Sequence, residues 1–322
     1  MIETKGNIKK IAVIGGGTGS YTVLKGLKNY PVHLSAIVSM ADDGGSTGKL
    51  RDEYGVLPPG DIRRCLVALS DSSDLMKKLF EYRFSHGSLE GHSFGNLFLT
   101  ALKEITREDG LSIKEAGKIL KIRGKVLPVT LGNIKLCAEL EDGQLIIGET
   151  KIDIPRHNSK LKIKKIFLYP EVDSTKEVLD VISDADLIII GPGDLYTSII
   201  PNFLVRGVSE AVANSKARKV YICNLMTKNG ETNNFKVTDF VTELEKYLGK
   251  EVIDTVIYNQ GNYDEELLNS YELEKAYPVG MDKENFSKFD MNFISGDLTS
   301  APVLIRHDSE KLAKFLLDGK LL

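Results

Sequence analysis

A glycine-rich segment with the sequence GGGTGS, residues 15–20, follows a short apolar run and precedes a helical pattern. Glycines let backbone N–H groups approach an anion closely, and a helix N-terminus adds the positive end of its dipole. The segment is neither a dinucleotide fingerprint, because Ser20 stands at the third glycine position, nor a Walker A loop, because no Gly-Lys-Ser/Thr follows. It predicts a phosphate site formed by Gly15, Gly16, Gly17, Thr18, Gly19 and Ser20. The alternative is a tight strand-to-helix turn that binds nothing.

A second polar segment, ADDGGSTGKLR at residues 41–51, follows the next apolar run. It has two adjacent carboxylates where a nicotinamide-binding protein would place one acid for the ribose. Adjacent loop residues can point apart, so one carboxylate can orient a ligand hydroxyl or a magnesium-bound phosphate while the other caps the glycine turn. We therefore expect Asp42, Asp43 and Ser46 to lie at the ligand. The alternative is that both carboxylates bond only to their own backbone.

Two arginines, Arg63 and Arg64, follow the sequence PPGD and fall in the first turns of a predicted helix. Positive charge there opposes the helix dipole, so an anionic partner explains the pair better than helix stability does.

The segment GHSFG at 91–95 has the letters of a nucleophile elbow, but no apolar strand precedes it, which argues against a hydrolase. His92 and Asn96 are predicted instead to line a pocket or to cap the following helix.

Polar residues also follow two later apolar runs, in GPGDLYTS at 191–198 and NLMTKNGET at 224–232. Because the carboxyl ends of parallel strands meet at one edge of a sheet, both segments should reach the same ligand. Arg306 follows the apolar run 303–305 and should reach it too, the alternative being a surface ion pair with Asp308 or Glu310. These segments add Gly193, Thr197, Asn224, Thr227 and Arg306 to the predicted ligand site.

The elements that must hold these loops follow an α/β rhythm. Short apolar runs predict buried parallel strands, and apolar residues at helical spacing predict helices. Asp142-Gly143 predicts a hairpin turn, and basic alternation at 160–165 is typical of the solvated face of an edge strand. Strands are predicted at 11–14, 34–38, 126–129, 134–140, 145–154, 163–168, 186–190, 219–223, 252–258 and 303–305. Helices are predicted at 21–29, 62–69, 75–84, 97–105, 113–120, 199–214, 237–248 and 310–317.

The composition narrows the function classes. The 322 residues include 42 basic and 45 acidic side chains, a net charge of −3, so binding to duplex nucleic acid is not expected. No apolar stretch reaches the roughly 18 residues of a membrane span. The 3 cysteines are far apart and lack C-x-x-C spacing, which argues against disulfides or zinc and suits a reducing cytoplasm. We expect one doubly wound, mainly parallel α/β domain over residues 1–322, with a helical and β insertion at about 62–170.

Six segments together resemble the family of the 2-phospho-L-lactate transferase and the bacterial gluconeogenesis factors. In chain order they are GGGTGS, ADDGGSTGKLR, PPGDIRR, GHSFGNL, GPGDLYTSIIPN and NLMTKNGET. The resemblance implies a Rossmann-like fold with a nucleotide-diphosphate ligand at the strand ends. The transferase branch moves a phospholactyl group from a guanosine diphosphate-type donor to a deazaflavin alcohol with the help of magnesium.

The last two segments are more similar to the gluconeogenesis-factor branch, whose members bind UDP-sugars and support cell shape and wall synthesis. One departure is Asp194, where this branch commonly has a small hydroxyl residue, and a carboxylate there would repel a diphosphate. The resemblance implies a cytoplasmic regulator that binds a UDP-sugar such as UDP-N-acetylglucosamine during growth on gluconeogenic carbon sources. The glycine loop would hold the diphosphate, Asp42 or Asp43 would contact ribose or sugar hydroxyls, and the arginines would supply charge.

Two other functions remain open at this point. A transferase of phosphorus-containing groups would use the same pocket with a nucleotide diphosphate donor, and Asp43 would then bind magnesium. A nicotinamide oxidoreductase is disfavoured by the broken fingerprint and the paired aspartates. The sequence is compatible with a homodimer and does not determine the oligomeric state.

Overall fold

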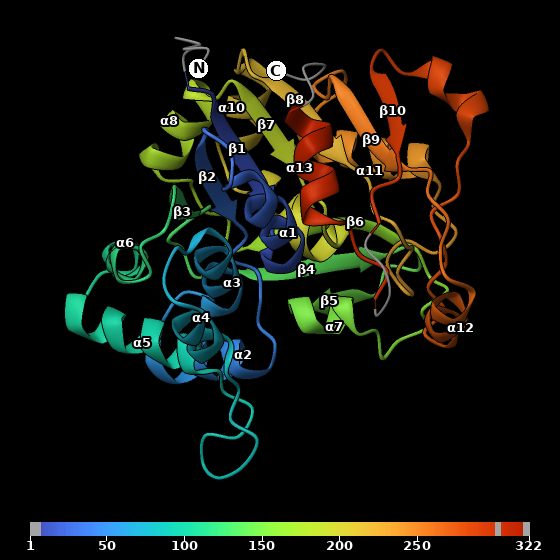
Figure 1. Cartoon of the computed structure of the whole chain (residues 1–322). Helices are drawn as coiled ribbons and strands as arrows, with labels where there is room; N and C mark the ends of the chain where they lie inside the picture. Colours follow the sequence, from blue (N-terminus) through green and yellow to red (C-terminus); the bar gives the residue numbers. More distant parts are fainter. Residues whose placement is uncertain (1–7, 300–303, 318–322) are drawn as a thin grey trace.

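The computed structural model of the chain describes residues 8–299 and 304–317. Its main feature is a seven-stranded sheet in the order β10-β9-β8-β7-β1-β2-β3, in which every neighbouring pair is parallel (Figure 1). The strands are β1 (Lys10–Gly15), β2 (His33–Val38), β3 (Lys125–Pro128), β7 (Leu187–Ile190), β8 (Arg218–Ile222), β9 (Thr255–Asn259) and β10 (Asn292–Gly296). This confirms the predicted doubly wound α/β fold.

Helices cover both faces of this sheet. The crossover from β1 to β2 runs toward one edge and the crossover from β7 to β8 toward the other, and right-handed crossovers in opposite directions lie on opposite faces. Helices α1 (Gly17–Leu27), α3 (Pro59–Leu69) and α13 (Ser309–Leu317) therefore share one face. Helices α8 (Lys176–Asp184), α10 (Val208–Asn214) and α11 (Val237–Leu248) cover the other.

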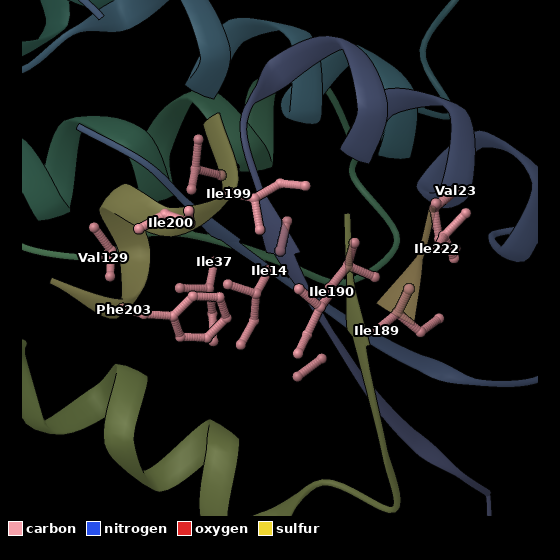
Figure 2. Packing of buried hydrophobic residues seen from close by; sticks show 14 of the residues in the cluster. Ile14, Val23, Ile37, Val129, Ile189, Ile190, Ile199, Ile200, Phe203 and Ile222 are labelled. Atoms are coloured by element: carbon pink, nitrogen blue, oxygen red, sulfur yellow. The ribbon is translucent and has the colours of Figure 1, made fainter. Parts of the chain in front are cut away.

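The core lies between the central strands and these helices. All four side chains of β7 are fully buried, as expected for a parallel strand covered on both faces. Figure 2 shows Ile14 of β1, Ile37 of β2 and Ile190 of β7 packed together with Phe203. The carboxyl ends of these strands are thereby held at fixed positions, and the predicted ligand loops follow them.

A second, three-stranded antiparallel sheet has the order β5-β4-β6. Its strands are β4 (Lys135–Leu140), β5 (Leu145–Ile147) and β6 (Ile163–Tyr169), which confirms the predicted hairpin and places β6 at an edge. The strand predicted over 145–154 is wrong beyond Ile147, because α7 (Glu149–Asp153) begins there. Although β3 lies within the predicted insertion at 62–170, it pairs with β2 in the large sheet.

Most predicted helices are confirmed, including α4 (Asp74–Glu81), α5 (Phe94–Thr106) and α6 (Asp109–Ile119). Two of the predicted loops are shorter than expected: α1 begins at Gly17, and α2 (Gly45–Tyr54) takes up most of the second glycine-rich segment. The helix predicted over 199–214 is divided into a π-helical turn (Leu195–Ile199), α9 (Ile200–Phe203) and α10. Gly207, with a φ of 90°, interrupts it between α9 and α10.

Three elements near the carboxyl half were not predicted: α8, α12 (Glu265–Leu273) and β10, besides a short 3₁₀ helix (Lys283–Lys288). The half-exposed side chains of β10 give it no apolar run, so its sequence pattern is weak. Of the strand predicted at 303–305, Val303 lies outside the described residues, and Leu304 and Ile305 are not in a strand. Among the described residues, no helix is long and apolar enough to cross a membrane.

Packing of α1 against α13 yields a first prediction, at Gly26. A Cβ atom there would overlap the backbone of Ser309, so Gly26→Ala forces the two helices apart. We expect it to lower the free energy of unfolding by about 1–3 kcal/mol, measured by chemical denaturation.

The matched control is Gly110→Ala in α6, where the nearest atom to an added Cβ is 3.7 Å away. That change should be neutral or stabilising by up to about 1 kcal/mol, because alanine favours helix more than glycine does. Equal effects of the two substitutions would contradict the close packing of α1 on α13.

Candidate functional site

A cavity of about 400 Å³ opens where β1, β7 and β8 end. It brings together predicted ligand residues that are separated by nearly the whole chain. These are Gly17, Thr18, Gly19, Gly193, Asn224, Thr227 and Arg306. It is also lined by residues that were not on the predicted list, among them Asp61, Asp194, Lys228 and His307.

The glycine loop after β1 is packed tightly against its neighbours. A Cβ atom at Gly19 would overlap the carbonyl oxygen of Pro192, so the loops that follow β1 and β7 touch through their backbones. A Cβ atom at Gly17 would overlap the carboxylate of Asp61. The glycines at these two positions are therefore required by loop packing, before any ligand is considered.

Not every residue of the loop faces the cavity. Ser20 is fully buried, and its Oγ lies 2.9 Å from a Cβ built on Gly15. Ser20, Gly15 and Gly16 do not line the cavity. The N–H groups and the Thr18 hydroxyl in the first turn of α1 remain as the donors that a ligand in the cavity can meet.

The two adjacent arginines of α3 point to different places. Arg64 does not line the cavity itself but donates a hydrogen bond to the hydroxyl of Thr18, which does. Arg63 is buried and donates to the carbonyl oxygen of Phe80 at 3.3 Å. Burial, followed by the charge of Arg64, lowers the pKa of Arg63 to about 10. Only Arg64 of this pair is placed to supply charge to a ligand in the cavity.

Asp61, the last residue of the PPGD segment, was not predicted at the ligand site, yet its carboxylate faces α1. Its Oδ2 lies 3.1 Å from a Cβ built on Gly16, and it accepts a hydrogen bond from the N–H of Gly17. Burial, followed by the charge of Asp42, raises the pKa of Asp61 to about 7. No local sequence signal distinguishes this role, because it depends on packing between α3 and α1.

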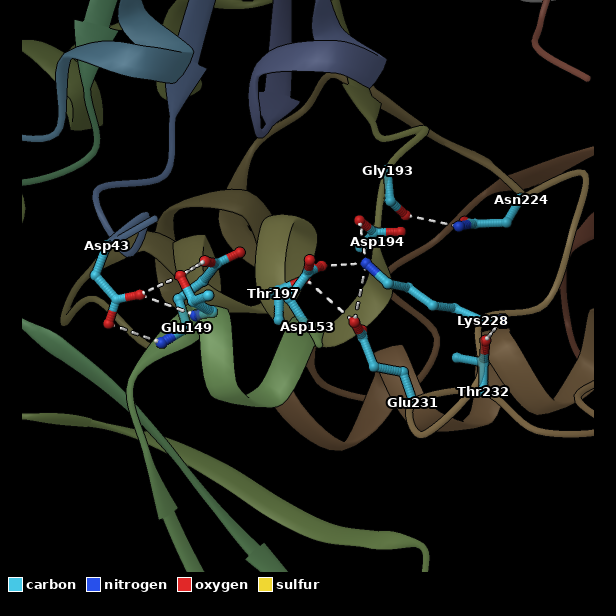
Figure 3. Close-up of polar contacts among 11 residues, drawn as sticks. Asp43, Glu149, Asp153, Gly193, Asp194, Thr197, Asn224, Lys228, Glu231 and Thr232 are labelled. Carbon is cyan, nitrogen blue, oxygen red and sulfur yellow. Dashed lines mark hydrogen bonds and ion pairs between the residues drawn. The ribbon is translucent and has the colours of Figure 1, made fainter. Parts of the chain in front are cut away.

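The paired carboxylates do point apart, as expected. Asp42 accepts a hydrogen bond from the N–H of Gly44 at 2.9 Å, which is the turn-capping role predicted for one of them. Asp43 accepts from the N–H groups of Glu149 and Thr150, at 3.1 and 2.9 Å, and from the Thr150 hydroxyl at 2.7 Å (Figure 3). Asp43 therefore fixes the beginning of α7, more than 100 residues away in the chain.

Three further predicted residues form a separate polar cluster. Ser46 Oγ lies 3.0 Å from His92 Nδ1, and Asn96 donates to Ser46 Oγ at 3.2 Å. The cluster joins the first turns of α2 and α5 and does not line the cavity. The cap of α5 is Ser93, which accepts from the N–H of Asn96 at 3.3 Å, so His92 and Asn96 are not the capping residues.

Lys228 is the centre of an ion-pair cluster at the cavity wall (Figure 3). Its ammonium contacts Asp153 of α7, Asp194 at 2.9 Å and Glu231 at 3.4 Å. Thr197 donates to Glu231 at 3.5 Å and so belongs to this cluster rather than to the cavity lining. The charge of Asp194, which the sequence suggested would repel a diphosphate, is offset here by Lys228.

Two cavity residues complete the arrangement near β8 and α13. Asn224 donates to the carbonyl oxygen of Gly193 at 2.8 Å, which ties together the loops after β8 and β7. Arg306 lines the same cavity as Gly17, as predicted, although Leu304 and Ile305 before it are not in a strand, so it does not reach the cavity from a strand end. Asp308, its suggested surface partner, accepts from the N–H groups of Glu310 and Lys311 and caps α13.

Comparison with known proteins shows which family the chain belongs to. Residues 11–299 match the model of the family described as 2-phospho-L-lactate transferase CofD. The chain belongs to this family. It is 46% identical over 316 residues to the gluconeogenesis factor of Bacillus subtilis, covering 97% of this chain and 98% of that protein. The gluconeogenesis factor of Halalkalibacterium halodurans is 42% identical over 315 residues, with 97% of each chain covered.

The fold is also shared with a solved structure. The crystal structure of a UPF0052 family member from Bacillus halodurans superposes with a TM-score of 0.92 at 42% sequence identity. The match covers 97% of this chain and 99% of the other. The curated relatives and this structure support the resemblance to the gluconeogenesis-factor branch of the CofD family.

The CofD family name raises the question of magnesium, which the resemblance assigns to Asp43. Both carboxylate oxygens of Asp43 accept hydrogen bonds from the beginning of α7. Within residues 8–299 and 304–317, no group of three or more His, Cys, Asp or Glu side chains is placed to hold a metal ion. Both oxygens of Asp43 are engaged by α7, magnesium at Asp43 stays a prediction, and no step of the function proposed below uses the ion.

A second cavity, of about 900 Å³, lies beside the small sheet in this CofD-family chain. Asp43, Thr150 and Lys151 line it together with the exposed side chains of Leu145 and Ile147. Helix α7 contributes to both cavity walls, through Thr150 and Lys151 here and through the Asp153–Lys228 ion pair at the smaller one. A ligand that displaces Lys228 would therefore break its ion pair with Asp153 and change the contacts of α7.

The Lys228 cluster yields a second prediction. Lys228→Met removes the one cation shared by Asp153, Asp194 and Glu231, of which Glu231 has a side chain only 1% exposed. We expect the free energy of unfolding to fall by about 1–3 kcal/mol at pH 8, because Asp153 and Asp194 lose the ammonium that they contact and Glu231 loses the charge that favours its ionised form. The measurement is urea denaturation monitored by circular dichroism.

The deficit should grow between pH 8 and pH 9, because Glu231, whose pKa burial raises to about 8, ionises over this range in the unmodified protein, whereas the loss of Lys228 keeps it protonated in the variant. Adding Glu231→Gln to the Lys228→Met variant should recover part of the loss at pH 8. Lys164→Met, which breaks an exposed pair with Glu139, serves as the control and should cost less than about 1 kcal/mol. A Lys228 effect no larger than this control would contradict the cluster.

Proposed function

We propose that this chain is a cytoplasmic gluconeogenesis factor that binds a UDP-sugar in the cavity between β1, β7 and β8. The observation that carries the proposal is the convergence of Gly17, Gly193, Asn224 and Arg306 on one cavity at the carboxyl ends of parallel strands. Nucleotides are bound at this edge in doubly wound folds. The names of relatives with 42–46% identity support the same physiological role.

The positions of the hydrogen-bond donors support binding of the ligand diphosphate near the beginning of α1. The first turn of α1 presents N–H groups and the Thr18 hydroxyl, with Arg64 beside them. Neighbouring strands lie about 4.8 Å apart, so the distance from the end of β1 to the end of β8 is on the order of 10 Å. A nucleoside diphosphate can span this distance, with its sugar-bearing end reaching the loop after β8.

In this proposal the protein acts as a binding regulator, and its role in the cell is to support shape and wall synthesis during gluconeogenic growth. Transfer of a phosphorus-containing group, the alternative raised by the sequence, is tested by looking for a reaction product. Incubation with UDP-N-acetylglucosamine, magnesium and candidate acceptors, followed by mass spectrometry, should return the nucleotide sugar unchanged. A product would assign the chain to the transferase class instead.

Ligand selectivity gives the third prediction. UDP-N-acetylglucosamine at about 100 times its dissociation constant should stabilise the protein by roughly 2.7 kcal/mol, seen as a rise in melting temperature. NAD at the same concentration should give no rise, because Ser20 replaces the third glycine of the dinucleotide fingerprint. Equal stabilisation by NAD would count against a UDP-sugar site.

Arg306 gives the fourth prediction. If its guanidinium contacts the ligand diphosphate, Arg306→Ala should weaken UDP-N-acetylglucosamine binding by about 1.5–3 kcal/mol, or some tenfold to 150-fold. Isothermal titration calorimetry measures the change. The control is Arg206→Ala, which breaks an exposed pair with Asp173 outside the cavity and should leave the dissociation constant unchanged. An unchanged constant in the Arg306 variant would remove this residue from the site.

A further inference from the structure

The N-terminus of α1 already faces a negative charge from within the chain. The Asp61 carboxylate lies against Gly16 and Gly17 and accepts a hydrogen bond from the N–H of Gly17. Asp61 also lines the cavity that the glycine loop opens into. An anion that approaches the first turn of α1 therefore meets this carboxylate at the place where helix N–H groups would bind it.

The groups around Asp61 come from four elements. Arg63 and Arg64 of α3 favour its charged form, as does the N–H of Gly17 at the beginning of α1. Asp42, which follows β2, disfavours it, and the buried Cys65 thiol lies on the same helix. Glu149 of α7 is a further carboxylate within electrostatic reach. Arg64 also donates to Thr18, so its charge is shared between Asp61 and the cavity.

Building on the UDP-sugar site, we propose that Asp61 is a specificity-determining residue that makes anion binding at α1 depend on uptake of one proton. The proton comes from solvent and is held on a carboxylate oxygen of Asp61 while the diphosphate is bound. A neutral carboxyl group removes the like-charge repulsion and can donate a hydrogen bond to a phosphate oxygen. The binding affinity for an uncharged ligand does not depend on this proton. Asp61 therefore makes the affinity of the site depend on the charge of the ligand.

The titration of Asp61 falls in the range where such coupling is measurable. Its pKa of about 7 leaves it largely protonated below that pH and ionised above it in the free protein. A bound diphosphate adds negative charge and raises this pKa further. Each pH unit above about 7 should therefore weaken binding by up to tenfold, whereas binding below pH 6.5 should vary little. The diphosphate diester of UDP-N-acetylglucosamine stays fully ionised throughout, so the protein must supply the dependence.

The test is calorimetric titration of UDP-N-acetylglucosamine at pH 6.5, 7.5 and 8.5, in two buffers with different ionisation enthalpies. For the unmodified protein we expect weaker binding at the higher pH values and net uptake of up to one proton at pH 8.5. Asp61→Asn keeps the size of the side chain without its charge, so it should abolish both the pH slope and the proton uptake. At pH 8.5 this variant should bind more tightly than the unmodified protein.

Glu274→Gln is the matched control, because Glu274 is an exposed carboxylate that lines the same cavity. This variant should keep the pH slope and the proton uptake. If Asp61→Asn fails to fold, absence of proton uptake by the unmodified protein still overturns the inference, and uptake that persists in Glu231→Gln, which removes the buried carboxyl of the Lys228 cluster with a pKa of about 8, supports it. Binding without proton uptake, or an Asp61→Asn variant that keeps the slope or binds more weakly at pH 8.5, overturns the inference while the UDP-sugar site stands. No binding by any variant at any pH overturns the site itself, and the inference with it.

Discussion

The loops after β1 and β7 touch backbone to backbone, and the geometry of the whole cavity depends on this contact. A side chain at Gly19 would overlap the carbonyl of Pro192, so the two loops can approach this closely only with glycine at that position. Asn224 then bridges from the loop after β8 to Gly193. Three neighbouring strand ends are thereby joined into one wall, and the first turn of α1 is left facing the space in front of it.

Carboxylates from elsewhere in the chain hold the ends of short helices around this wall. Asp43 holds the beginning of α7, and Asp61 faces the beginning of α1. Both arrangements satisfy backbone N–H groups that would otherwise lack partners. The same acids that look like ligand or metal contacts in the sequence are therefore engaged in joining segments that are distant along the chain.

The electrostatics of the site follow from this crowding of acids. Burial raises the pKa of Asp61 to about 7, that of Glu231 to about 8 and that of Glu149 to about 9. Lys228 offsets part of the negative charge by contacting carboxylates from three segments, including Asp153 of α7. A cavity for an anionic ligand is thus built within an acidic environment, and its charge balance depends on lysine, arginine and bound protons.

Sequence alone determined the parallel sheet and the edge at which the loops meet, because buried runs such as 187–190 and the glycine segments after them are local signals. It also determined the family, through motifs spread along the chain. It did not find β10, whose side chains are half-exposed, or α12, whose side chains are largely exposed, and it extended the strand at 145–154 into α7. The tertiary structure alone decided which way each polar side chain points. Arg63 turns inward while Arg64 reaches Thr18, and Ser20 is buried while Thr18 lines the cavity. Neighbouring residues on a helix differ in direction by about 100°, so residue type and position do not fix which of them meets the cavity until the packing partners are in place.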